Sequence, residues 1–123
     1  MNKKIGEIIK ELRNEKGISL RKLAEIVNVS NVNILYIEKG RINTSLPVLK
    51  GIAKALNYNI YKLLSLANMI DDDIRNIINK KPVLITAFLR AAKKLNNNDW
   101  KILTEKIINN ELNLKVSKGF KDA

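Results

Sequence analysis

Residues 18–40, ISLRKLAEIVNVSNVNILYIEKG, hold two serines, each followed by a short segment of helical apolar spacing, and a closing glycine. A serine just before such a segment caps a helix, because its hydroxyl accepts a hydrogen bond from a free N–H in the first turn. Ser19 and Ser30 therefore predict helices over 20–27 and 31–39, with Gly40 ending the second. Two helices so close along the chain must meet at a sharp angle and share a core.

Apolar contacts and one asparagine fix the turn between these helices. Ile18 and Leu23 flank the first cap, and Val29 and Ile34 flank the second, at the spacing of a hydrophobic staple. Asn28 stands at the corner, and asparagine tolerates the left-handed backbone conformation that a sharp turn requires. The sequence therefore predicts a defined angle between the two helices.

The second helix divides into an apolar and a polar face. Ile34 and Ile37 lie three residues apart and are expected to pack inward, where the small Ala24 of the first helix allows close approach. The side chains left outward mix amide, methyl and phenol groups: Asn31, Val32, Asn33 and Tyr36. Asparagine can pair with an adenine edge and valine can contact a thymine methyl group, so this face suits the major groove of DNA. A lone helix of this kind would more simply be a solvated surface, but the caps, the turn and the preceding helix favour an interface.

The stretch from about Ile5 to Leu66 resembles the phage repressor and Cro (XRE) type of helix-turn-helix domain, a family of transcription regulators. The resemblance covers about half of the chain and rests on four segments: LRNEKGIS, KLAEIVNVS, IEKG and SLPVLKGIAKALNYNIYKLL. It implies five short helices, of which the second and third form the DNA reader.

The same resemblance implies which residues contact DNA. Base contacts are expected from Asn31, Val32, Asn33 and Tyr36. Phosphate contacts are expected from Ser19, Lys39, Arg41 and Asn43. Leu20 stands where many members carry a glutamine that contacts the DNA backbone, so that contact is expected either to be missing or to be supplied by Arg21 or Lys22. The family also has an internal salt bridge at the positions of Arg13 and Glu38, which would otherwise be ordinary surface charges.

The charge of the chain fits a polyanionic partner. The net charge is +11, and residues 1–66 carry 12 Lys and Arg against 5 Asp and Glu, or +7. A positive field speeds encounter with double-stranded DNA and supplies the sequence-independent part of its affinity. An anionic membrane surface would attract it too, but no apolar run approaches the roughly 18 residues of a spanning helix. Charged residues at 7, 10 and 11 interrupt any signal-peptide core, so we expect a cytoplasmic protein without a membrane partner.

Composition argues against an enzyme. The chain has no His and no Cys, which removes the usual proton shuttle, the thiol nucleophile and most zinc sites. The acidic run at 71–73 is read as the first turn of a helix rather than as a metal site, because carboxylates favour the positive end of the helix dipole. We therefore expect no cofactor, no metal and no catalytic residue.

Helical periodicity continues over the whole chain and predicts an all-α fold. Three helices, over 3–16, 46–56 and 60–66, are expected to join the two described above and complete a five-helix repressor-like domain. About three further helices are expected over 71–79, 82–95 and 97–112. We divide the chain into a helix-turn-helix DNA-binding domain at 1–67, a C-terminal helical hairpin at 68–112 and a flexible tail at 113–123.

The segment 82–95 is apolar over most of its circumference, so it must be covered on more than one side. We expect the hairpin to form a homodimer, although packing of the hairpin against the DNA-binding domain is an alternative. The expected dimerisation residues are Leu84, Phe88, Leu89, Ala92, Leu95, Trp100, Leu103 and Ile107. A two-fold dimer would read a near-palindromic site with half-sites about 34 Å apart.

Two functional classes follow from these features. The first is a sequence-specific transcription regulator, most simply a homodimeric repressor. The second is an antitoxin or antagonist whose C-terminal helices bind another protein, with DNA binding secondary. In a regulator, substitution of the outward asparagines would weaken DNA binding. In an antitoxin or antagonist, substitution of Phe88 or Trp100 would weaken binding of the partner protein.

Overall fold

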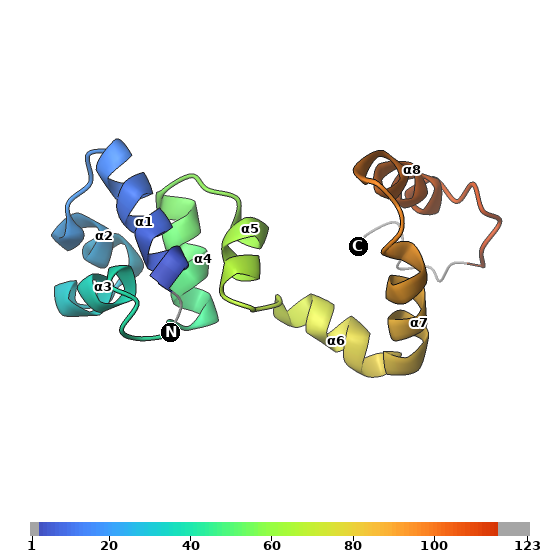
Figure 1. Cartoon of the computed structure of the whole chain (residues 1–123), viewed down its shortest axis with the longest axis horizontal. Coiled ribbons are helices and arrows are strands. Elements are labelled where there is room, and N and C mark those ends of the chain that lie inside the picture. The colour runs from blue at the N-terminus through green and yellow to red at the C-terminus, as the bar shows by residue number, and fades with distance from the viewer. Residues whose placement is uncertain (1–2, 116–123) are drawn as a thin grey trace. The chain divides into compact units, whose positions relative to one another are not determined.

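The computed structural model describes residues 3–115, which form eight helices and no strand. The helices are α1 (Lys3–Glu15), α2 (Leu20–Val27), α3 (Asn31–Glu38), α4 (Leu46–Ala55), α5 (Ile60–Leu66), α6 (Asp72–Lys80), α7 (Pro82–Ala92) and α8 (Asn97–Ile108). The expected all-α architecture, with five repressor-like helices and three further ones, is confirmed (Figure 1).

The chain divides between residues 76 and 77, inside α6, into two compact units. The functional division that we expect at residue 67 is a different boundary and stays a prediction. Residues 113–115 follow α8 without regular structure. The rest of the tail that we expect to be flexible, 116–123, lies outside the described residues.

The first unit brings α1–α5 together (Figure 1), and all five helices contribute to one apolar core. α2 packs against both α3 and α4, and α1 packs against α3 and α5. The fully buried side chains are large and aliphatic: Ile9, Leu23, Ile34, Ile37, Leu49, Ile52, Leu56 and Leu63. α3 is thus held on its inner side by helices that come before and after it in the sequence.

Side-chain caps begin these helices as the sequence predicts. The Ser19 hydroxyl accepts a hydrogen bond from the N–H of Lys22 at 3.0 Å, and Ser30 accepts one from Asn33 at 3.1 Å. Ser45 caps α4 and Asn59 caps α5 in the same way. Asparagines in the left-handed conformation follow several helices: Asn28, Asn57, Asn68 and Asn110. They replace the glycine that commonly ends a helix.

α1 and α3 approach each other at Gly6, which is buried. A Cβ atom at this position would lie well inside van der Waals contact with the carbonyl oxygen of Glu38 and 2.5 Å from that of Ile37. Backbone atoms cannot rotate away as a side chain can. Only glycine therefore fits where α1 crosses the end of α3.

An exposed ion pair ties the segment before α6 to α4. The Lys50 Nζ donates to Asp71 Oδ1 at 2.8 Å, and the same oxygen accepts the N–H of Asp72 at 2.9 Å. The hydrogen bond from Lys50 lowers the pKa of Asp71, and the same bond raises the pKa of Lys50. Because folding lowers the pKa of Asp71, the pair stabilises the protein at pH values above the ordinary pKa of a carboxyl group. This contribution is lost as the pH falls through the lowered pKa of Asp71.

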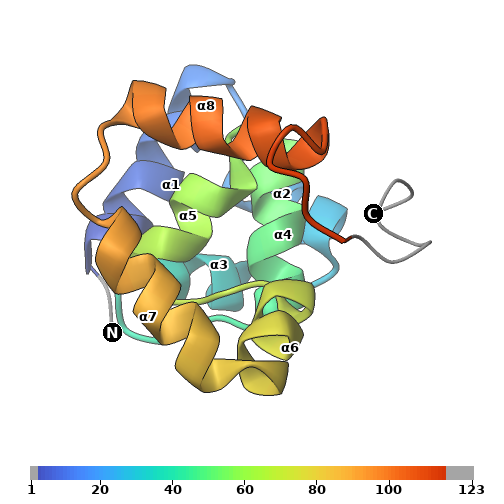
Figure 2. The same cartoon turned by 90° about the vertical axis from the view of Figure 1, so that its right-hand side faces the viewer.

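The second unit contains α7 and α8, joined by a short loop (Figure 2). The rings of Phe88 and Trp100 meet edge to face with centroids 6.5 Å apart, and Ala92 is buried. The outer side of α7 stays apolar and open, with Val83 80% and Leu84 68% exposed. No helix in the part of the chain described by the structure is long and apolar enough to cross a membrane.

Five helices end earlier than the sequence predicts, and in α1 and α4 the difference is a single residue. α3 ends at Glu38 instead of Lys39 because Gly40 adopts φ +68°. α7 ends at Ala92 instead of 95, since the chain turns to present Asn96 as the extended cap of α8. α8 ends at Ile108 instead of 112 because Asn110 adopts φ +54°, and the N–H of Glu111 bonds back to the carbonyl of Lys106.

Candidate nucleic-acid interface

The turn between α2 and α3 fixes the direction in which α3 leaves the core. Asn28 has φ 58° and ψ 50°, and the next N–H, that of Val29, bonds to the carbonyl of Ala24 at 3.0 Å. Ala24 is 1% exposed, so the two helices lie close together. On α3 itself Ile34 and Ile37 are fully buried. The core therefore fixes both the path of α3 and its rotation about its own axis.

This rotation leaves the predicted base-reading side chains on the outer side of α3. Asn31 is exposed, Val32 is 53% exposed, Tyr36 is 37% exposed and Asn33 is half-buried. The backbone N–H of Asn33 donates to the Ser30 cap, and its side-chain amide makes no hydrogen bond within residues 3–115. The four side chains offer amide donors and acceptors, a branched methyl group and an aromatic ring along the first two turns of one helix.

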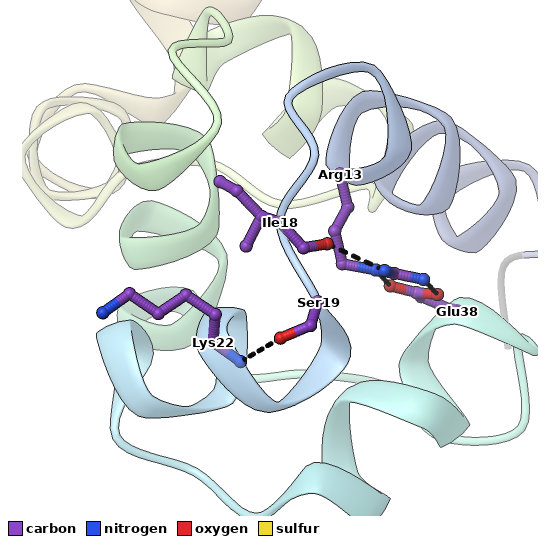
Figure 3. Close-up of polar contacts among 5 residues, drawn as sticks. All are labelled: Arg13, Ile18, Ser19, Lys22 and Glu38. Carbon is purple, nitrogen blue, oxygen red and sulfur yellow. Dashed lines mark hydrogen bonds and ion pairs between the residues drawn. The ribbon is translucent and has the colours of Figure 1, made fainter.

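The residues predicted to contact phosphates are all exposed: Ser19, Arg21, Lys22, Lys39, Arg41 and Asn43. The Ser19 oxygen accepts the Lys22 N–H, and the hydroxyl proton is still free to donate (Figure 3). The Lys22 ammonium lies 3.9 Å from Glu25, and both side chains are exposed, so this contact holds the lysine weakly. Leu20 is half-buried against the core and takes no part in the exposed set.

Arg13 and Glu38 form a buried ion pair behind α3. Arg13 Nε donates to Glu38 Oε2 at 2.7 Å and Nη2 donates to Oε1 at 3.1 Å, with side-chain exposures of 10% and 3% (Figure 3). Arg13 Nη1 also donates to the carbonyl oxygen of Ile18 at 2.9 Å. One guanidinium thus joins the end of α1, the residue before the α2 cap and the last turn of α3. The contact to Ile18 has no sequence signal, because it depends on the path of the backbone.

A second arginine lies at the outer end of α3. The guanidinium carbon of Arg41 is 5.9 Å from the centroid of the Tyr36 ring, over its face. The resemblance assigned Tyr36 to base contacts and Arg41 to phosphate contacts, with no link between them. Arg41 lies beyond the end of α3, so helical periodicity does not predict the contact, and only the structure shows it.

Residues 9–63 match the helix-turn-helix family. The matched segment contains α2, the turn and α3, with most of the core that orients them. This segment of the chain belongs to the helix-turn-helix family. This confirms the resemblance that the sequence segments indicated.

Three known proteins are similar to the chain over about half of its length. It is 33% identical over 61 residues to the HTH-type transcriptional regulator DdrOP3 of Deinococcus deserti, covering 50% of this chain and 47% of that protein. It is 30% identical over 69 residues to the competence pilus inhibition repressor of Acinetobacter baylyi, covering 56% of this chain and 63% of that protein. The crystal structure of SinR, the master regulator for biofilm formation, in complex with DNA is 36% identical, covers 49% of this chain and 97% of that one, and has a TM-score of 0.46. The chain therefore spans about half to two thirds of the length of these two curated relatives.

Proposed function

We propose that this chain is a sequence-specific DNA-binding transcription regulator that reads base edges in the major groove with the outer face of α3. The observation that carries the proposal is the α2–turn–α3 unit, whose buried side fixes four outward side chains on one helix. The net charge of +7 over residues 1–66 supports it, because this charge attracts the phosphate backbone. The names of the two curated relatives, one a regulator and one a repressor, also support it.

Each outward side chain has a chemical role in this proposal. Asn31 and Asn33 pair with adenine edges, Val32 contacts a thymine methyl group, and Tyr36 lies at the end of the reading face. Phosphate contacts from Ser19, Arg21, Lys22, Lys39, Arg41 and Asn43 set the register on the duplex without reading sequence. A reader of this kind is a binding protein and uses neither catalytic residues nor a cofactor.

Selection of sites from a random duplex library at near-physiological salt tests this function. We expect enrichment of one sequence, and we expect Asn31→Ala or Asn33→Ala to weaken binding to it by about 1–3 kcal/mol. Asn14→Ala is the matched control, because Asn14 is an exposed asparagine in α1 and should leave affinity unchanged. No enrichment above salt-sensitive background, or equal affinity for all three variants, would contradict base reading by α3.

We also propose that the regulator acts as a homodimer through α7 and α8. The support is the exposed apolar surface of the second unit, in which Leu84, Phe88 and Leu89 are each more than two fifths exposed. Ala92 of this unit is buried, and four further apolar residues are half-buried: Leu95, Trp100, Leu103 and Ile107. Soluble monomers rarely leave such a contiguous apolar patch uncovered. A two-fold pair would place two α3 helices on half-sites about 34 Å apart, which requires a near-palindromic operator.

The double variant Leu84→Asp, Leu89→Asp tests the dimer. Because both side chains are already exposed, the substitutions should leave the fold intact while adding charge to the apolar surface. We expect the mass measured by light scattering to fall from two chains to one and operator affinity to fall with it. Arg90→Asp is the control, since it changes net charge equally and lies on the opposite side of α7. A double variant that stays dimeric, or wild-type protein that is monomeric on its operator, would overturn the proposal.

A further inference from the structure

The end of α3 is closed by a tight hydrogen-bonded turn. Gly40 has φ +68°, and its N–H donates to the carbonyl of Ile37 at 3.0 Å. The N–H of Arg41 donates to the carbonyl of Tyr36 at 2.9 Å. These two bonds form the Schellman arrangement that ends many helices at a glycine. The turn brings the side chain of Arg41 back over the third-last residue of α3, which is Tyr36.

The contact at this point of a Schellman turn is usually between two apolar side chains. Here it is a guanidinium over an aromatic ring, with the guanidinium carbon 5.9 Å from the ring centroid. The attraction comes from the negative face of the ring. This contact uses no hydrogen bond, so it leaves the N–H groups of the Arg41 guanidinium free. These N–H groups make no hydrogen bond to any residue in the described range 3–115.

We propose that Tyr36 is a positioning residue that holds the Arg41 guanidinium against a DNA phosphate at the end of α3. The proposal rests on the proposed function, because it requires α3 to lie on DNA. A free arginine loses much side-chain freedom when it binds a phosphate. The Tyr36 ring restricts that freedom before binding, while the guanidinium N–H groups stay open for paired hydrogen bonds to phosphate oxygens.

This role differs from base reading in what it predicts. A ring that acts through Arg41 changes affinity for every duplex alike, because phosphates carry no sequence information. A phenol that reads a base changes affinity for the selected sequence alone. The ring, and not the hydroxyl, does the positioning, so phenylalanine should replace tyrosine at this position without loss.

The test is a double-mutant cycle measured on the selected operator and on a random duplex, at several salt concentrations. We expect Tyr36→Leu to weaken binding to both duplexes by about two- to fivefold, which corresponds to an exposed cation–π contact. Tyr36→Phe should keep wild-type affinity. Arg41→Ala should reduce the slope of log K against log salt by about 0.9, the value for one lost phosphate contact. In the Arg41→Ala background, Tyr36→Leu should have no further effect. Tyr61→Leu, which removes an exposed tyrosine from α5, is the matched control.

Two results would overturn the positioning role. One is a loss of affinity in Tyr36→Phe restricted to the operator, which would make the hydroxyl a base reader. The other is full additivity of Tyr36→Leu and Arg41→Ala, since independent residues do not share an effect. Failure of the proposed function looks different, because wild-type protein would then show no preference for any duplex.

Discussion

Gly6→Ala is expected to destabilise the first unit by about 2–4 kcal/mol, although alanine is the better helix former. The substitution places a Cβ atom against the carbonyl oxygens of Glu38 and Ile37, which belong to the backbone of α3. Relief requires α1 and α3 to move apart, and that movement opens the core around Ile9 and Ile34. Urea denaturation followed by circular dichroism measures the loss.

Gly51→Ala is the matched control for this substitution. Gly51 also lies inside a helix, α4, so the gain in helix propensity is the same. A Cβ atom there would lie 3.1 Å from Cγ1 of Val27, a side-chain atom that can shift. We expect a change of less than about 1 kcal/mol. If both alanine variants unfold at the same urea concentration, α1 and α3 are not as close at Gly6 as the structure has them.

Glu38→Ala is expected to cost about 3–5 kcal/mol, because it leaves the guanidinium of Arg13 buried without its partner. The double variant Arg13→Met, Glu38→Leu should recover most of that loss, since apolar side chains of similar size avoid burying any charge. A double-mutant cycle on the free energy of unfolding measures the coupling. The remaining cost in the double variant should reflect the lost hydrogen bond from Arg13 to the carbonyl of Ile18.

The Lys22–Glu25 pair supplies the control for this cycle. Both of its side chains are more than three fifths exposed and the charged atoms are 3.9 Å apart, so Glu25→Ala should change stability by less than about 1 kcal/mol. Equal losses in Glu38→Ala and Glu25→Ala would show that the Arg13 pair behaves as a surface pair. The buried pair would then contribute nothing particular to holding the last turn of α3.

Local chemistry made much of the first unit predictable. The serine caps, the staples and the left-handed Asn28 all act within a few residues, so the bounds of α2 follow directly from the sequence. The end of α8 does not, because Asn110 can continue a helix or end it, and the choice depends on its surroundings. The same limit applies to Gly6, whose importance comes from a neighbour more than 30 residues away.

The interface was predictable to a different degree. The outward positions on α3 follow from its buried ones, Ile34 and Ile37, by the period of the helix. The contact between the Arg41 guanidinium and the Tyr36 ring could not be predicted, since it depends on the left-handed Gly40 turning the chain back. The base and phosphate contacts stay predictions, because each is a property of the complex with DNA.

The split of α3 between buried and outward residues has a consequence for how such a regulator changes over time. Folding depends on Ile34, Ile37 and Glu38, whereas Asn31 and Val32 carry little of the stability. Under the proposed function, a substitution at an outward position therefore changes which operator is preferred while the scaffold tolerates it. Duplicated copies of the gene could diverge toward new targets through a few surface substitutions, with the interior left as it is.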